Sequence, residues 1–138
     1  MPKKSVSRKK MTRAEERDLD IEIGFLEGVV RRDPQYLEAL QILGDDYTRR
    51  GKYAEGLSID EQLARLRGDD PLVQYNLACS YALTGQFEPA VASLERAIAL
   101  GYRDFNWLAK DPDLSALRKH PLYRTIRAKL KAIVIKVR

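Results

Sequence analysis

The 138-residue sequence predicts an all-α protein in which short helical hairpins repeat along the chain. The clearest hairpin spans residues 71–101, where two stretches of helical apolar periodicity are separated by Thr84 and Gly85. The same order of large and small residues occurs 34 positions earlier, and self-similarity at a fixed period is typical of stacked repeats. The composition agrees, since Ala, Leu, Arg, Glu and Lys dominate a chain with 44% hydrophobic and 33% charged residues.

The two copies share their large and small positions. The earlier copy has Leu43, Gly44, Tyr47, Gly51, Tyr53, Gly56 and Leu63. The later copy has Leu77, Ala78, Tyr81, Gly85, Phe87, Ala90 and Ala97. Asp60 is the one clear exception to the pattern. Small residues allow close approach of neighbouring helices, and the large ones fill the space beside them, so successive hairpins are expected to stack.

A 34-residue period with this order of residues resembles the tetratricopeptide repeat (TPR) over roughly residues 19–104. The resemblance implies a short right-handed α-solenoid of helical hairpins. The run ALGYRD, followed by DPDLSALRKHPLY, resembles the closing segment of a recurrent bacterial group of these proteins and extends the likeness to about residue 130. It implies a degenerate C-terminal capping repeat.

The first elements are expected as follows. Residues 1–12 form a basic disordered tail. Thr12 and Glu15 match a capping box, and Asp33-Pro34 is a stop signal, so residues 13–35 are the N-terminal helix of a partial repeat.

This first helix has apolar residues on both sides. Its predicted core-facing residues are Leu19, Ile23, Leu26 and Val30. Ile21 and Phe25 lie on the other side and could cover the tail, a second chain or a partner. Gly24 and Gly28 each weaken a helix and predict that another helix passes close by.

Two full repeats and a closing segment complete the solenoid, which spans residues 13–131. The first full repeat is residues 36–70 and the second is residues 71–104, with Asp70 as N-cap and Pro71 at the first helical position. Residues 105–131 are the closing segment. Residues 132–138 are a basic C-terminal tail, either a helix extension or a strand-like end.

Charge is distributed unevenly. Residues 1–17 contain seven Lys or Arg and two Glu. Residues 18–117 contain ten Lys or Arg and eighteen acidic residues, and residues 118–138 contain eight Lys or Arg and no acidic residue. The basic N-terminus lacks the apolar segment of a secretory signal, and the longest late apolar run is too short to span a membrane. A cytoplasmic location is therefore expected.

The resemblance also implies where a partner binds, because the first helix of each repeat lines the concave side. The corresponding positions are Glu38, Gln41, Asp45, Thr48 and Arg49 in the first full repeat and Leu72, Tyr75, Asn76, Cys79 and Ala82 in the second. This half-acidic, half-apolar groove suits an extended or helical protein segment that carries Lys or Arg beside apolar side chains. The paired acids Asp45-Asp46 and Asp69-Asp70 are interpreted as solvated faces and helix caps.

The leading hypothesis is a non-enzymatic adaptor that binds a protein segment along this groove. No phosphate-binding loop, metal cluster or nucleophile-base pair is visible, so no cofactor or metal is expected. The alternative is an accessory protein of an RNA-containing or polyanionic assembly, docked through basic termini. Its candidate contacts are Lys3, Lys4, Arg8, Lys9, Lys10, Arg124, Arg127 and Lys131. The basic ends could also meet the acidic body of a second copy and cause self-association.

Overall fold

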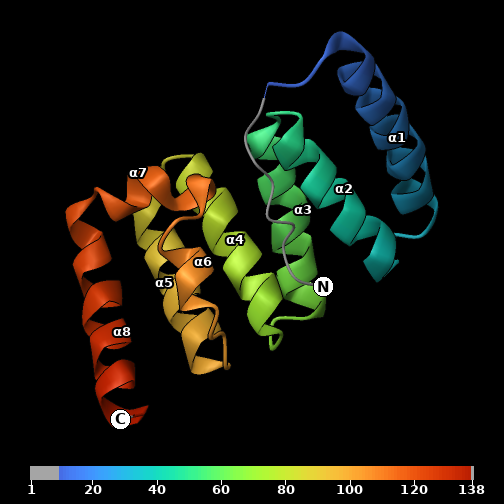
Figure 1. Cartoon of the computed structure of the whole chain (residues 1–138). Coiled ribbons are helices and arrows are strands. Elements are labelled where there is room, and N and C mark those ends of the chain that lie inside the picture. Colours follow the sequence, from blue (N-terminus) through green and yellow to red (C-terminus); the bar gives the residue numbers. More distant parts are fainter. Residues whose placement is uncertain (1–9, 138) are drawn as a thin grey trace.

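A computed structural model describes residues 10–137, and all regular structure in that range is helical (Figure 1). The longer helices come first: α1 (Arg13–Arg32), α2 (Leu37–Arg49), α3 (Tyr53–Leu66), α4 (Pro71–Leu83) and α5 (Phe87–Ala99). Short elements follow: α6 (Phe105–Leu108), η1 (Pro112–Leu114), α7 (Ser115–Arg118), η2 (Pro121–Tyr123) and finally α8 (Arg124–Val137). The predicted all-α class is confirmed.

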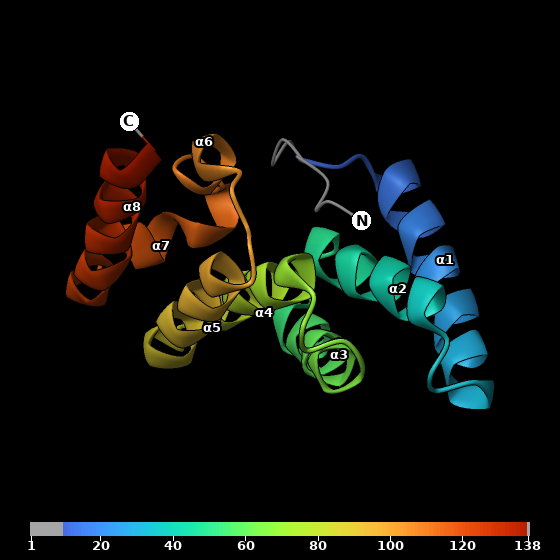
Figure 2. The same cartoon turned by 90° about the horizontal axis from the view of Figure 1, so that it is seen from below.

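Helices that are adjacent in sequence pack against one another. Contacts join α1 to α2, α2 to α3, α3 to α4 and α4 to α5, so the chain advances from one helix to the next (Figure 1). Seen from below, α1 and α8 lie at opposite ends of the chain and α4 lies near its middle (Figure 2). Each interior helix therefore has neighbours on two sides.

The repeat period of the sequence reappears in the backbone. Helices α2 and α4 are separated by one full repeat at both their first and their last residues. Each is followed by a glycine in the left-handed region, Gly51 with φ 82° and Gly85 with φ 76°. In both turns the amide after the glycine donates to the carbonyl of a tyrosine, Tyr47 or Tyr81, at 2.8 Å. Glycine adopts positive φ without steric cost, so the same turn closes both hairpins.

Helix α1 has the predicted start and end. The Thr12 side chain accepts from the Glu15 amide, Glu15 accepts in return from the Thr12 amide, and the helix ends at Arg32 before Asp33. Leu19, Ile23 and Leu26 are buried. These features confirm the capping box and the predicted core face.

The outer side of α1 does not meet another helix in the described part of the chain. A Cβ atom at Gly24 would have no neighbour within 4 Å, and one at Gly28 would meet only Arg32 from its own helix. Ile21 and Phe25 are 71% and 69% exposed. The prediction of a helix passing close to these glycines is therefore wrong for residues 10–137.

The core has two clusters of buried side chains. One joins α1, α2, α3 and Val73, and the other joins α4, α5 and the elements that follow them. Trp107 and Phe105 pack against the second cluster. The two clusters meet at α4, which contributes Val73 to one and Tyr75 to the other.

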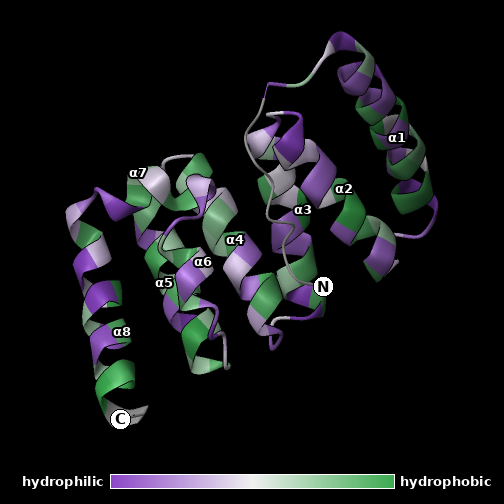
Figure 3. Cartoon of the chain, in the orientation of Figure 1, coloured by the Kyte–Doolittle hydropathy of each residue, from purple (hydrophilic) through white to green (hydrophobic). Residues whose placement is uncertain are grey.

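The closing segment lies along α4 and α5. Helix α6 stops after one turn, because Asp111-Pro112 follows and proline cannot continue a helix. Contacts join α4 to η1 and α7, and α5 to η2 and α8. Helix α8 alternates hydrophilic and hydrophobic residues along its length and reaches Val137, so residues 132–137 extend the helix (Figure 3).

Candidate functional site

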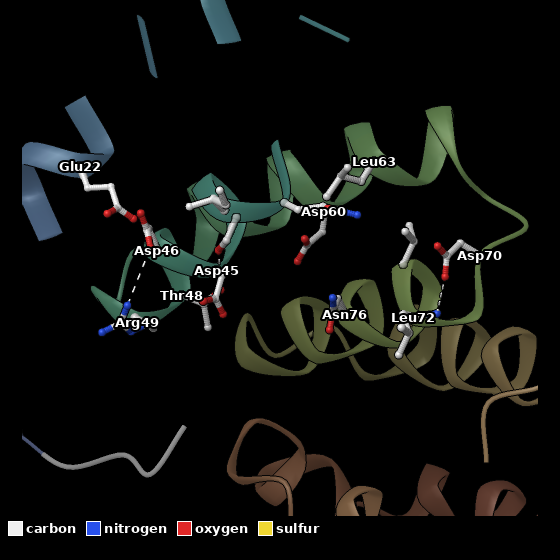
Figure 4. A pocket seen from close by; sticks show the side chains of 14 residues that line it. Glu22, Asp45, Asp46, Thr48, Arg49, Asp60, Leu63, Asp70, Leu72 and Asn76 are labelled. Atoms are coloured by element: carbon white, nitrogen blue, oxygen red, sulfur yellow. Dashed lines mark hydrogen bonds and ion pairs between the residues drawn. The ribbon is translucent and has the colours of Figure 1, made fainter. Parts of the chain in front are cut away.

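A pocket of about 220 Å³ opens between α2 and α4 (Figure 4). Residues from α2 and α4 line most of it, and Asp60 and Leu63 of α3 and Glu22 of α1 complete the wall. Close to its α4 side, Asp70 caps that helix by accepting from the Leu72 amide at 2.9 Å. The pocket thus depends on the stacking of two consecutive hairpins.

The lining of this pocket is strongly acidic. Carboxylates come from four places in the sequence: Glu22, the neighbours Asp45 and Asp46, Asp60 and Asp70. Within the part of the chain that the structure describes, Arg49 is the only Lys or Arg of the lining, and its guanidinium lies 3.9 Å from Asp46 Oδ1. A cation therefore gains favourable electrostatic energy on entering the pocket.

Six of the ten predicted groove residues line this pocket. They are Gln41, Asp45, Thr48, Arg49, Leu72 and Asn76. Thr48 is buried, and its hydroxyl donates to the Gly44 carbonyl at 3.1 Å. Glu38 is exposed on α2 and is not part of the lining. These six positions thus lie around one pocket, whose lining also includes Glu22, Asp46, Asp60 and Asp70, which were not among the predicted groove residues.

One of the missed residues carried a sequence signal, and another was misinterpreted. Asp60 breaks the repeat pattern, and in the structure it is 8% exposed and accepts a hydrogen bond from Ser80. Asp46 is 2% exposed, so its interpretation as part of a solvated face is wrong. Its carboxyl group points toward Glu22 of α1 (Figure 4), and burial at this contact removes it from water.

Three predicted groove residues are not accessible to a partner. Tyr75, Cys79 and Ala82 are 1%, 0% and 3% exposed, because the closing segment covers them. The Tyr75 ring stacks on Tyr102, with centroids 4.4 Å apart and planes within 7°. Burial raises the pKa of the Tyr75 hydroxyl far above its usual range, and nearby Cys79 and Asp111 act in the same direction. In the second repeat, the closing segment of the chain therefore occupies the space beside the predicted groove residues.

Asp111 holds the closing segment on α4. Its Oδ2 atom accepts from the Tyr75 hydroxyl at 2.6 Å, and its Oδ1 atom accepts from the Asp113 amide at 2.9 Å. The guanidinium of Arg118 donates to the carbonyls of Leu108 and Asp111, at 3.0 and 2.8 Å. The Tyr75 bond joins the closing segment to α4, and the Asp113 and Arg118 bonds hold α6, η1 and α7 together within that segment.

Cys79, Asp111 and Asp113 also form a buried group of metal-ligand types, with ligand atoms within 4.8 Å of one another. Asp111 already accepts from Tyr75 and from the backbone, and the Cys79 sulfur lies 3.7 Å from its Oδ2 atom. These hydrogen bonds indicate that Asp111 holds the closing segment in place on α4.

Asp46 has an unusual proton affinity. Its pKa is raised to about 7, mainly because burial disfavours the charged form. Glu22 adds to the shift through a hydrogen bond and its charge, and Asp45 adds charge repulsion, whereas Arg49 opposes it. The carboxyl groups of Glu22 and Asp46 point toward one another (Figure 4). A proton held between them relieves the repulsion of two close carboxylates.

The predicted polyanion contacts fall in separate places. Lys3, Lys4, Arg8 and Lys9 lie outside the described residues, and Lys10 is exposed before α1. Arg124, Arg127 and Lys131 lie on one side of α8, and all three are exposed. Arg127 also donates to the Arg118 carbonyl at 2.8 Å and lies over the Tyr123 ring.

Comparison with known proteins gives limited information. No family model matches the chain. The chain is 34% identical, over 64% of its own length, to a protein of Arabidopsis thaliana that is described as chloroplastic. It spans only 26% of that relative, so the likeness concerns one part of a longer protein. None of the helices within the described residues has the length and apolar character needed to cross a membrane.

Proposed function

We propose that this protein is a non-enzymatic adaptor of the TPR kind, in which a short right-handed solenoid holds a segment of a partner protein. Two features support the solenoid: the bounds of α2 recur in α4 after one repeat period, and both hairpins use the same glycine turn. A cytoplasmic location belongs to this proposal.

The observation that carries the proposed function is the open pocket between α2 and α4. It combines several carboxylates with the apolar surface of Leu72 and the exposed Ile42. Such a surface suits an extended or helical segment with basic and apolar side chains. The carboxylates attract the basic side chains of the segment, and the apolar residues of the pocket bury its apolar side chains. Since the closing segment covers Tyr75, Cys79 and Ala82, the proposed contact surface is confined to the first repeat and the start of the second.

Affinity capture with cross-linking mass spectrometry tests this function. The chain is used as bait with two variants, Leu72→Asp in the pocket and Glu88→Gln on α5, where Glu88 is exposed and lies outside the lining. We expect a protein cross-linked near α2 and α4 that Glu88→Gln retains and Leu72→Asp loses. Equal capture by both variants, with cross-links confined to α8, would contradict the groove hypothesis.

A second candidate function is docking to RNA or another polyanion through α8. This helix has no Asp or Glu, and it carries Arg124, Arg127 and Lys131 on one side. Phosphate contacts of this kind weaken steeply as salt increases. Capture that survives Leu72→Asp but disappears after nuclease treatment or with Arg124→Gln and Lys131→Gln would favour this alternative.

A further inference from the structure

Helix α1 has an uncovered apolar face. It forms one end of the array (Figure 2), and within the described part of the chain its extensive contacts are with α2. Leu19, Ile23 and Leu26 are buried on its inner side. On its outer side, Ile21 and Phe25 lie one turn apart and are 71% and 69% exposed. Two neighbouring large apolar side chains in this position are typical of a contact surface.

The position of Phe25 is buried in the later repeats. Ile59 in α3 and Ser93 in α5 follow Phe25 by one and two repeat periods, and each is only 8% exposed. Ile59 lies against Gly44 of α2, where an added Cβ atom would come within 3.2 Å of Ile59 Cγ2. At Phe25, α1 therefore lacks the neighbour that α3 has in α2.

We propose that α1 of a second copy covers this face and that two copies form a symmetric, antiparallel dimer, independently of the function of the pocket. A two-fold contact uses the same surface on both chains, so the surface must complement itself. Ile21 and Phe25 share their side of α1 with Gly24 and Gly28. A Cβ atom at Gly24 would have no neighbour within 4 Å, and one at Gly28 would meet only the end of Arg32. The glycines therefore leave room for the large side chains of the second copy.

A two-fold axis between Gly24 and Phe25 brings large and small residues together. Facing positions of the two antiparallel helices are then equally far from the axis, so Ile21 lies opposite Gly28 of the second copy. The two Phe25 rings meet at the axis, where an aromatic pair adds to the apolar contact. Glycine receives a large side chain in the same way within the chain, where Gly44 of α2 lies against Ile59 of α3.

The charges at the two ends of this face favour the antiparallel direction. Asp18 and Arg32 are exposed on the same side of α1, and neither has an ion pair among residues 10–137. The axis places Asp18 opposite Arg32 of the second copy, whereas a parallel pair would bring like charges together. Arg17, at the edge of the face, lies near the basic end of the second copy and offsets part of this gain. Exposed ion pairs add little affinity, so the charges select the direction and the apolar residues supply the affinity.

The first measurement is the association of the full chain. Helix α1 has 20 residues and is about 30 Å long, so the contact is at the small end of specific interfaces. Analytical ultracentrifugation from about 1 to about 500 μM should show a reversible monomer–dimer equilibrium. Phe25→Glu should weaken the dimer at least about tenfold. Ile135→Glu is the matched control, since Ile135 on α8 is 73% exposed, and it should leave the dimer unchanged.

Gly28→Gln separates dimer formation from folding. Glutamine is the better helix former, and Gln62 has the same position one repeat later, so the monomer should melt at the wild-type temperature or above it. The same side chain fills the space that Ile21 of the second copy needs, and the dimer should weaken several-fold. An equally strong dimer in this variant would overturn the proposed close approach at the glycines.

Charge reversal tests the direction of the two helices. Asp18→Arg and Arg32→Asp should each weaken the dimer several-fold, because each places like charges opposite one another. The two changes in one chain should restore it. A double variant weaker than either single variant would overturn the antiparallel arrangement.

A photoreactive residue at the centre of the face identifies its occupant. Phe25→benzoylphenylalanine should cross-link to α1 of a second copy, which mixtures of isotope-labelled and unlabelled chains distinguish from contacts within one chain. Cross-links to residues 1–9 of the same chain, or to another protein in a cell extract, would overturn the proposal. A monomer at every concentration would also overturn it, as would association that Ile135→Glu removes and Phe25→Glu retains.

Discussion

In the first full repeat, Gln41, Asp45 and Thr48 line an open pocket, whereas Tyr75, Cys79 and Ala82, at the equivalent positions of the second, are buried beneath the closing segment. The backbones of the two repeats correspond, since α2 and α4 start and end with the same offset and close with the same glycine turn. The difference therefore lies in side chains. Polar residues line an open pocket in the first repeat, and aromatic and small apolar residues are covered by a segment of the chain itself in the second.

The two repeats remain alike on another side. Tyr47 donates to Glu27, and Tyr81 donates to Glu61, with both members of the second pair one repeat period further along the chain. These bonds tie each first helix to the helix before it. The tyrosine and glutamate positions that join successive helices are thus alike in the two copies, whereas the positions that line the pocket in the first repeat differ in the second.

The largest expected effect comes from Tyr75→Ala. This change removes the stack on Tyr102 and the bond to Asp111, and it leaves a cavity under the closing segment. We expect a loss of about 3–5 kcal/mol in the free energy of unfolding, measured by urea denaturation. Gln41→Ala, at the corresponding position of the first repeat, should cost less than about 1 kcal/mol. Similar losses in both variants would contradict the difference in burial between Gln41 in the first repeat and Tyr75 in the second.

A smaller effect is expected for Gly44→Ala. A Cβ atom at Gly44 would lie 3.2 Å from Ile59 Cγ2 and from Asp60 Oδ1, so the neighbouring helix must move. The second repeat has Ala78 at this position and the smaller Ser93 in place of Ile59, which explains why alanine fits there. We expect destabilisation of about 1–3 kcal/mol in a thermal melt.

Gly24→Ala is the matched control for this substitution. The site has no neighbour within 4 Å, and alanine should stabilise α1 by up to about 1 kcal/mol. If Gly44→Ala were neutral and Gly24→Ala damaging, the packing of α2 on α3 would be contradicted.

A pH-dependent effect of about 1 kcal/mol is expected for Asp46→Asn. The folded-state pKa of about 7 lies above the unfolded value, so the folded chain binds this proton more tightly and stability declines as pH rises from about 4 to about 7. Asparagine removes this penalty. The variant should melt roughly 3 °C higher than wild type at pH 8 and about equally at pH 4. A lower melting temperature at both pH values would instead indicate that the carboxylate is needed for packing.

The smallest expected effects concern the tyrosine hydroxyls. Tyr47→Phe and Tyr81→Phe each remove one hydrogen bond, to Glu27 and Glu61 respectively. We expect each to cost roughly 0.5–1.5 kcal/mol in urea denaturation, with similar values in the two repeats. A difference of several kcal/mol between them would mean that the repeats are not equivalent on this side.

Much of the fold could be predicted from the sequence because its signals are local. The capping box at Thr12, the turn glycines Gly51 and Gly85 and the proline after Asp111 each act within a few residues. The pocket was predicted only in part. Gln41 and Asp45 follow from the repeat positions, but the approach of Glu22 to Asp46 depends on how α1 lies against α2, which no local pattern specifies.

By itself, the sequence determined the helical class, the repeat period and the hairpin boundaries, because helix propensity, capping and glycine conformation depend on near neighbours. Only the tertiary structure decided which inner face stays open. The closing segment packs Asp111 and Tyr102 onto Tyr75 in the second repeat, while no segment among the described residues fills the pocket beside Asp45 and Asp46 in the first. The physical reason is that burial and charge in the pocket come from residues far apart in sequence, and only their packing brings them together.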